Sequence, residues 1–415
     1  MTGDNKIAFK FPVGYNEFHR KQLFNYQLNR WHSFGYARFE EMEEAGRRIN
    51  DFDDWKHVMV ELAERAAAED RLMNAAFYYR AAEFYTFQDD PEKELLYDRF
   101  AGLFYQVFED EGIERYEVPY GDAFLPALKL PAAKGMGANI DEPAPGAGHA
   151  GNGMTAGSMA AASQTTGEGA KKGTIVMHGG FDSYIEEFYS WMRYFSDRGY
   201  DVIAFEGPGQ GAARKKYGLA IDYRWERPAK AVLDYFDLTD VTWLGVSMGG
   251  YFCFRAAAFE PRISRVIASG IAYDYMQFVN KFFQWIMMLF FTHLRNFSNK
   301  ETLKKMKKDG MHRWSIENLM YISMAETPMD AFDVVKQMNA ENLHSELVKQ
   351  EVLILTGRND HFIPFKMHSM QVRALINARS VTARVFTKET QAHNHCQNGN
   401  FGLALDVMAE WIEQI

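Results

Sequence analysis

The stretch Leu244-Gly245-Val246-Ser247-Met248-Gly249-Gly250 places a serine between glycines, directly after the apolar run 241–244. A buried strand has no need for a polar residue flanked by residues without side chains, whereas a sharp and crowded turn does. Residues 248–259, which follow the serine, have the composition of a helix. The pattern predicts a strand, a tight turn that strains the backbone at Ser247, and a helix.

Short apolar runs rich in β-branched residues alternate with helical segments on both sides of this stretch. These runs are residues 174–180, 201–209, 241–247, 265–271, 352–360 and 383–389. Short strands that are apolar on both faces and separated by helices are typical of a parallel sheet covered on both sides. The predicted fold is therefore α/β, with ligands bound beyond the carboxyl ends of the strands.

The remaining chain divides by composition. Residues 1–112 are predicted to form an N-terminal helical domain, and residues 113–415 the α/β domain, which starts with a hairpin turning at Gly121 and Asp122. Two segments interrupt the α/β domain. Residues 132–172 are rich in Gly, Ala and Ser and are predicted to form a loop, and residues 272–350 are predicted to form a helical cap insertion.

The serine predicts nucleophilic chemistry, which requires a base and an acid in the order Ser, Asp, His. Asp360 follows the apolar run 352–357 and is the candidate acid. His393 and His395 both follow the last predicted strand, and we expect His395 to be the base because it opens the segment that leads into the final helix. His361, next to the acid, is not expected to be the base.

An oxyanion would need backbone donors near the serine. The N–H of Met248, at the start of the predicted helix, is one candidate, and the N–H of Gly180 or Phe181, after the first central strand, is the second. Glu206 and Asp274 also follow predicted strands and are candidate substrate contacts. Asp274 could also act as an extra acid, but a helix cap is its favoured interpretation. The sequence contains no HExxH motif and no third ligand spaced to join His393 and His395, so neither a metal nor another cofactor is predicted.

Composition narrows the functional classes. The 415 residues carry a net charge of −9 without a long basic run, which argues against nucleic-acid binding. The chain has 2 cysteines and starts without an apolar signal segment, so a cytoplasmic protein is expected. The apolar run 282–294 is too short to span a bilayer and is expected to be a buried or lid helix.

Several motifs together resemble the α/β-hydrolase superfamily: residues 178–187, 205–211, 245–252, 357–364 and 392–399. With the N-terminal helices, the layout is similar to esterases of the fermentation/respiration-switch type. It also resembles 2,6-dihydroxypseudooxynicotine hydrolases and fungal polyketide-shortening hydrolases. The resemblance covers residues 15–415 apart from the Gly/Ala/Ser-rich segment. It implies Ser247, Asp360 and His395 as a catalytic triad, a helical domain packed over the site, and a homodimer.

The expected function is that of a serine hydrolase that cleaves a carboxylic ester of a medium-sized apolar or aromatic small molecule. Members of the resembling branch also hydrolyse carbon–carbon bonds next to ketones, so hydrolysis of a β-diketone-like or polyketide-like substrate is the alternative, and peptidase activity is a third. A different class of function is a non-catalytic scaffold that binds a protein through its helical domain.

Overall fold

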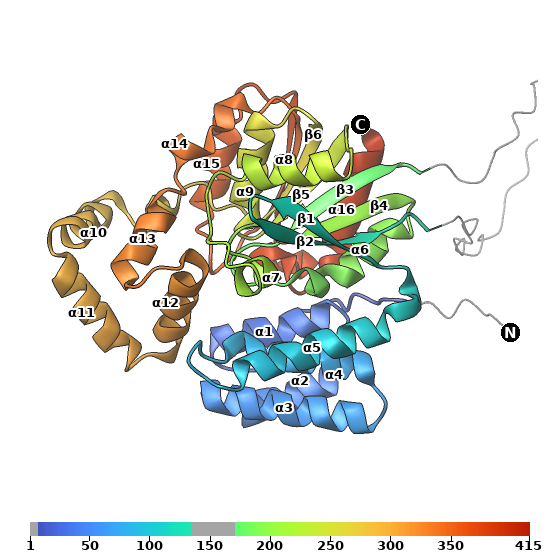
Figure 1. Cartoon of the computed structure of the whole chain (residues 1–415), viewed down its shortest axis with the longest axis vertical. Helices are drawn as coiled ribbons and strands as arrows, with labels where there is room; N and C mark the ends of the chain where they lie inside the picture. Colours follow the sequence, from blue (N-terminus) through green and yellow to red (C-terminus); the bar gives the residue numbers. More distant parts are fainter. Residues whose placement is uncertain (1–6, 134–170) are drawn as a thin grey trace, which may run out of the picture.

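The computed structural model describes residues 7–133 and 171–415. Nearly all of the loop predicted at residues 132–172 lies outside the described residues. The centre of the molecule is an eight-stranded sheet with the order β1-β2-β4-β3-β5-β6-β7-β8 (Figure 1). Its strands are β1 Glu114–Tyr120, β2 Ala123–Leu130, β3 Gly173–His178, β4 Tyr200–Phe205, β5 Val241–Val246, β6 Ile263–Ser269, β7 Glu351–Gly357 and β8 Ser380–Phe386.

Strands β3 to β8 run parallel, and only β1 and β2 pair antiparallel. Neighbouring residues of one strand enter different hydrophobic cores. In β3, Ile175 and Met177 belong to the core on one side of the sheet and Val176 to the core on the other. Because side chains alternate along a strand, a run that is apolar at every position must be covered on both faces. The predicted mostly parallel sheet with helices on both faces is confirmed.

Helices on the two faces account for this burial. The helices that connect the strands or follow the last strand are α6 Tyr189–Ser196, α7 Gly211–Lys215, α8 Glu226–Tyr235, α9 Gly249–Phe259, α15 Lys366–Ala374 and α16 Phe401–Gln414. Residues of α8 and α9 join the core that contains Val176, whereas residues of α6 and α16 join the core that contains Ile175.

The N-terminal helices form a layer beneath the sheet (Figure 1). They are α1 Gln22–Ser33, α2 Phe39–Arg48, α3 Phe52–Ala68, α4 Leu72–Tyr85 and α5 Lys93–Val107. Their large side chains, among them Trp31, Trp55 and Phe77, belong to the same hydrophobic core as Ile175 and Met177 of the sheet. This layer is therefore packed directly against the α/β part of the chain by buried apolar contact.

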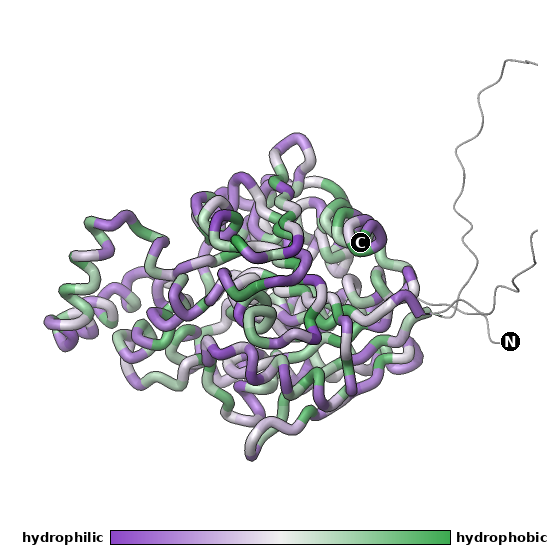
Figure 2. Tube along the Cα trace, turned by 90° about the horizontal axis from the view of Figure 1, so that it is seen from above, coloured by the Kyte–Doolittle hydropathy of each residue, from purple (hydrophilic) through white to green (hydrophobic). Residues whose placement is uncertain are grey.

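A helical insertion separates β6 from β7, as predicted. It contains α10 Lys281–His293, α11 Arg295–Met306, α12 Gly310–Ser323, α13 Pro328–Lys336 and α14 Ala340–Leu343. Helices α10 and α11 project from the body of the molecule, and the hydropathy colouring in Figure 2 shows hydrophobic residues along this projection. None of the helices in residues 7–133 and 171–415 combines the length and the apolar character needed to cross a membrane.

Of the two expectations for residues 282–294, the buried helix is wrong and the lid helix stays a prediction. Helix α10 contains no buried residue, and Phe282, Phe283 and Trp285 are 65%, 59% and 64% exposed. One side of α10 packs on its neighbours, since the ring of Phe291 lies 4.4 Å from that of Phe332 in α13. The other side faces outward, because apolar composition specifies a need for burial but supplies no partner.

Candidate active site

Ser247 sits at the tip of the turn between β5 and α9. Its φ is +62°, a left-handed conformation that is uncommon for a residue with a side chain. The glycines beside it allow strand and helix to approach: a Cβ on Gly245 would lie 2.0 Å from the carbonyl oxygen of Gly249, and one on Gly250 would lie 1.9 Å from that of Gly270. The sequence pattern and the observed turn therefore have the same steric cause.

Three polar side chains from distant parts of the chain form one hydrogen-bonded row at the carboxyl end of the sheet. Ser247 Oγ lies 2.8 Å from His395 Nε2, and His395 Nδ1 lies 2.7 Å from Asp360 Oδ2. Asp360 follows β7, and His395 opens the short helix η6 (His395–Gln397) after β8. The other carboxylate oxygen of Asp360 accepts backbone N–H bonds of 2.9 Å from Phe362 and Ile363, so the acid is held from both sides.

The electrostatics of His395 and Asp360 favour a charged pair. Burial works to lower the pKa of His395, but the adjacent Asp360 carboxylate outweighs it and the pKa lies well above its ordinary value. Burial likewise works to raise the pKa of Asp360, and the His395 imidazolium with the two backbone N–H groups brings it below its ordinary value. This arrangement suits an imidazole that must carry a proton during a reaction.

The other histidines near the sheet do not contact Ser247. His393 is 9% exposed, and its ring packs edge-on to Tyr15 at 6.0 Å. The His361 ring packs against Tyr26 at 4.9 Å, and burial lowers its pKa to about 4. Of the two histidines considered from the sequence as the base, the structure therefore brings His395, and not His393, to the serine.

His178 orders the loop that follows β3. Trp243 donates its indole N–H to His178 Nε2 at 3.0 Å, which leaves the proton of the neutral ring on Nδ1, where it is donated to the carbonyl oxygen of Gly179 at 3.1 Å. Burial lowers the pKa of His178 to about 4. His178 is therefore neutral and makes two hydrogen bonds, which fix the loop that carries Gly180 and Phe181.

The candidate oxyanion donors converge above Ser247. A Cβ on Gly180 would lie 2.7 Å from the backbone nitrogen of Met248, so only glycine permits this approach of the β3 loop to the start of α9. Met248 and Phe181 both line the cavity that contains Ser247, whereas Gly180 does not. Gly180 and Phe181 both stay candidates for the second donor beside Met248.

Glu206 and Asp274 lie outside this cavity, and a role in substrate contact finds no support in their surroundings. Asp274 caps the short helix η3 (Tyr275–Phe278) by accepting the Met276 N–H at 2.8 Å, in agreement with the helix-cap interpretation of the sequence. Glu206 is buried and accepts the N–H groups of Ile185 at 3.2 Å and Ala212 at 2.5 Å. It therefore ties the β3 loop to the start of α7.

The cavity beside Ser247 has a volume of about 380 Å³. Its walls come from three parts of the chain, and the aromatic lining residues include Phe34 and Phe84 from the N-terminal helices, Trp314 from α12 of the insertion, and Phe362. A larger and more open depression, of about 950 Å³, lies between α3 and α11 and contains none of the three residues of the hydrogen-bonded row. Among the described residues, no group of three or more His, Cys, Asp or Glu side chains is placed to hold a metal ion.

Sequence reasoning missed the polar lining residues Gln27, Arg30 and Asp182. Gln27 and Arg30 belong to α1, which is buried over most of its length and lies more than 200 positions from the serine, and no local pattern links them to it. Asp182 could have been identified from the sequence, because it directly follows Phe181 in the loop predicted to supply an oxyanion donor.

Comparison with known proteins agrees with this fold. Residues 173–388 match the family model of the alpha/beta hydrolase fold. Hydrolase acrC from Aspergillus aculeatus is 28% identical over 323 residues, which cover 72% of this chain and 69% of that protein. The 20-hydroxy-prefusarin hydrolase FUS2 from Gibberella moniliformis is 27% identical over 213 residues, covering 45% of this chain and 48% of that protein. The chain thus spans about half the length of several curated relatives that it matches.

Two solved structures share the arrangement over most of the chain. The crystal structure of the 2,6-dihydroxy-pseudo-oxynicotine hydrolase is 20% identical with a TM-score of 0.59, covering 92% of this chain and 94% of that one. AbyA5 is 18% identical with a TM-score of 0.58, covering 86% and 85%. At these identities the likeness concerns the fold. The family model spans just over half of this chain, and the curated relatives are named hydrolases, so the chain belongs to the α/β-hydrolase fold family and is a hydrolase.

Proposed function

We propose that Ser247, His395 and Asp360 form the catalytic triad of a serine hydrolase. Ser247 Oγ attacks the substrate carbonyl while His395 Nε2 takes its proton, and Asp360 orients the imidazole and stabilises the imidazolium. The oxyanion accepts the N–H groups of Met248 and Phe181, with Gly180 as the other candidate for the second donor. His395 then protonates the leaving group, and water releases the acyl group from Ser247.

The observation that carries this proposal is the continuous row of hydrogen bonds from Ser247 to His395 to Asp360 at the wall of an apolar cavity. The 2.8 Å bond joins Ser247 to His395, which are more than 100 positions apart in the sequence. The 2.7 Å bond joins His395 to Asp360, which are 35 positions apart. A protein that used this fold only as a binding scaffold would have no need for a nucleophile, base and acid aligned in order. The row therefore favours an enzyme over the scaffold alternative.

The substrate that fits best is a medium-sized apolar or aromatic carboxylic ester. A cavity of about 380 Å³ is near the lower end of the range for small-molecule sites, and aromatic side chains dominate its lining. Hydrolysis of a carbon–carbon bond next to a ketone is the alternative, since the same triad serves it and the leaving carbanion then needs a proton. Asp274, a candidate for that extra acid, is engaged as a cap and lies outside the cavity, which favours the ester.

The same proposal gives the helical segments a role. Residues 1–112 act as a cap-like domain and residues 113–415 as the catalytic domain, with the insertion at 272–350 completing the cavity wall. Support comes from the cavity lining, which combines Tyr26 of α1, Tyr85 of α4 and Leu319 of α12 with Ser247. The cytoplasmic location and the homodimer expected from the sequence stay predictions.

A paired assay tests the function. Purified protein is offered p-nitrophenyl esters of increasing acyl length and, separately, a small aryl β-diketone, with Ser247→Ala as the blank. We expect ester turnover that depends on Ser247 and an inert diketone. Diketone cleavage with feeble ester turnover would replace the esterase proposal by carbon–carbon hydrolysis. Failure of a fluorophosphonate to label Ser247 would refute the serine-hydrolase proposal itself.

A further inference from the structure

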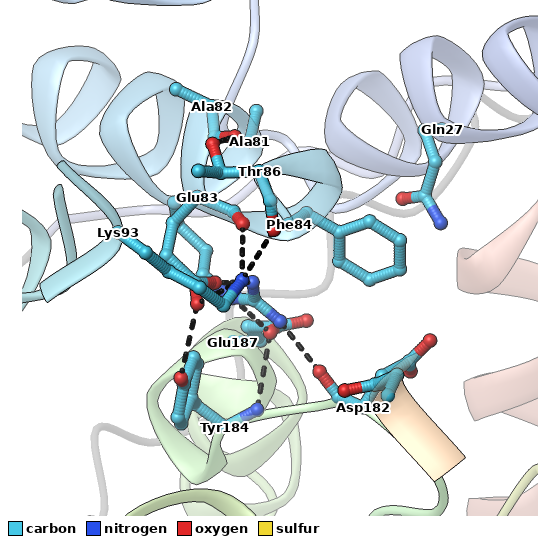
Figure 3. A network of polar contacts seen from close by, with 12 residues as sticks. Gln27, Ala81, Ala82, Glu83, Phe84, Thr86, Lys93, Asp182, Tyr184 and Glu187 are labelled. Atoms are coloured by element: carbon cyan, nitrogen blue, oxygen red, sulfur yellow. Dashed lines mark hydrogen bonds and ion pairs between the residues drawn. The ribbon is translucent and has the colours of Figure 1, made fainter. Parts of the chain in front are cut away.

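Asp182 lies in the loop after β3, next to the proposed oxyanion donor Phe181. The loop is fixed from below: Arg80 of α4 donates from Nη2 to the carbonyl oxygen of Asp182 at 2.6 Å and from Nε to Glu187 at 2.6 Å. The Tyr184 N–H also donates to Glu187, at 3.1 Å. In Figure 3, Asp182 lies at the edge of this network, and its contact with the network is made by its backbone.

The carboxylate of Asp182 has no partner of its own. Within the described residues, its carboxylate oxygens take part in no ion pair and no hydrogen bond, although the side chain lines the cavity with Ser247 and His395. Asp182 is half-buried, and a ligand that fills the cavity would bury its carboxylate oxygens, where an acceptor without a donor is unfavourable. Two unpaired oxygens that face a cavity therefore point to a donor supplied by the ligand.

The charges around Asp182 offset part of the cost of burying its carboxylate. The network beneath the loop combines three cations, Arg30, Arg80 and Lys93, with two carboxylates, Glu83 and Glu187, so one positive charge is left over. Burial raises the pKa of Asp182, and the nearby Arg30 guanidinium limits the rise. Arg30 and Arg80 thus offset part of the effect of burial on the Asp182 carboxylate without occupying its oxygens, which remain free for a ligand.

The other polar side chains of the cavity are already engaged or are weaker acceptors. Arg30 is paired with Glu187, and its Nη1 lies 3.4 Å from Gln27 Oε1. The rest of the lining is mostly aromatic or aliphatic. Asp182 directly follows Phe181, a candidate oxyanion donor, and lines the same cavity as Ser247, so the carboxylate belongs to the end of the cavity where the chemistry takes place.

We propose that Asp182 is a specificity-determining residue that accepts a hydrogen bond from a hydroxyl or N–H group placed near the scissile carbonyl of the substrate. The substrate class is then a hydroxylated or N–H-bearing aromatic or apolar acyl compound, rather than a plain hydrocarbon ester. This inference rests on the proposed function, because it uses the same cavity and the same acyl chemistry at Ser247.

The experiment compares matched esters. p-Nitrophenyl phenylacetate lacks a hydroxyl group, p-nitrophenyl mandelate carries one on the carbon next to the carbonyl, and p-nitrophenyl tropate carries one a carbon further away. For each enzyme, kcat and KM are measured on all three esters, and the hydroxyl preference is the ratio of kcat/KM with and without the hydroxyl group. The variants are Asp182→Ala and Asp182→Asn. Asp122→Asn makes the same chemical change in the exposed hairpin turn and serves as the control.

Comparing the preference between enzymes cancels the intrinsic reactivity of the esters. A hydrogen bond to a charged group is worth about tenfold or more in affinity, so we expect Asp182→Ala to lower the preference for at least one hydroxy ester by about tenfold. Asp182→Asn keeps an uncharged acceptor and should retain part of the preference, whereas Asp122→Asn should equal the wild type. Turnover of the phenylacetate should change much less in every variant.

The controls separate the two proposals. If fluorophosphonate does not label Ser247 of the wild type, the proposed function has failed. If labelling and ester turnover are intact but the wild type and Asp182→Ala show the same preference with both hydroxy esters, the assignment of Asp182 is overturned. An equal loss on all three esters, with slower labelling of Ser247 or a lower melting temperature, would make Asp182 a structural residue and also overturn it.

Discussion

Replacing Asp360 by asparagine is expected to disable His395 by fixing the wrong tautomer of its imidazole. Oδ1 of Asp360 accepts the N–H groups of Phe362 and Ile363 at 2.9 Å each, whereas Oδ2 lies 2.7 Å from His395 Nδ1. The single oxygen of an asparagine amide has to stay with the two backbone donors, so its NH₂ group must face Nδ1. An NH₂ group only donates, which forces Nδ1 to be the acceptor and places the ring proton on Nε2.

A protonated Nε2 cannot take the proton of Ser247, 2.8 Å away. The loss of a correctly oriented base in such a triad lowers kcat by about 10⁴-fold, or about 5 kcal/mol of transition-state stabilisation. The fold should persist, because asparagine has nearly the same shape as aspartate and preserves both backbone hydrogen bonds. The defect is therefore expected in kcat rather than in the melting temperature.

The assay compares kcat and kcat/KM of Asp360→Asn and Asp360→Ala on one p-nitrophenyl ester. Alanine removes the acid but imposes no tautomer, so the asparagine variant should be at least as inactive as the alanine variant. Thermal unfolding of both proteins checks that they are folded. The reasoning is refuted if Asp360→Asn is clearly more active than Asp360→Ala, or if it stays within about tenfold of the wild type.

Further measurements test the triad and the electrostatics. Ser247→Ala and His395→Ala should each lower kcat by about 10⁴- to 10⁶-fold, whereas His393→Ala should have a much smaller effect; loss of activity in His393→Ala alone would reverse the choice of base. Because the pKa of His395 is raised, kcat/KM on an ester should increase with pH and its acidic limb should lie above the ordinary histidine pKa of 6.5; a pH profile with a limb at or below that value would contradict this. Burial and the neighbouring Glu186 raise the pKa of Glu206 from 4.5 to about 8. The folded state then binds more protons than the unfolded state in this range, so stability should fall as pH rises from about 4.5 to about 8. Glu186→Gln should make the fall shallower in urea unfolding across that range, and an unchanged slope would show that the two carboxyl groups do not interact.

Much of the candidate active site was predictable because its signals are local. The strained turn at Ser247 requires the glycines Gly245 and Gly249, and both lie within two positions of the serine. Asp360 and His395 each follow an apolar strand, and parallel strands bring their carboxyl ends to one edge of the sheet. Order along the chain and strand periodicity were sufficient to place these residues at the same edge.

Other features have no local signal. The choice between Gly180 and Phe181 depends on the path of a loop above Met248, which is set by His178 and its contact with Trp243. The exposure of α10 was misread because its apolar composition is the same whether or not another element covers it. For Asp274 the sequence favoured a cap but left a substrate contact open, and only its bond to the Met276 N–H in the structure identifies it as a cap.

The sequence by itself determined the class of fold and the order of the proposed nucleophile, acid and base, because short-range sterics and the two-residue period of strands depend on neighbouring residues. Only the tertiary structure decided what surrounds the serine. Arg30, Phe84 and Trp314 reach the cavity although they lie 217, 163 and 67 positions from Ser247 in the sequence, and the Asp182 carboxylate is left unpaired there. Such contacts arise when separate apolar faces are buried against one another, and no stretch of sequence specifies its partner alone.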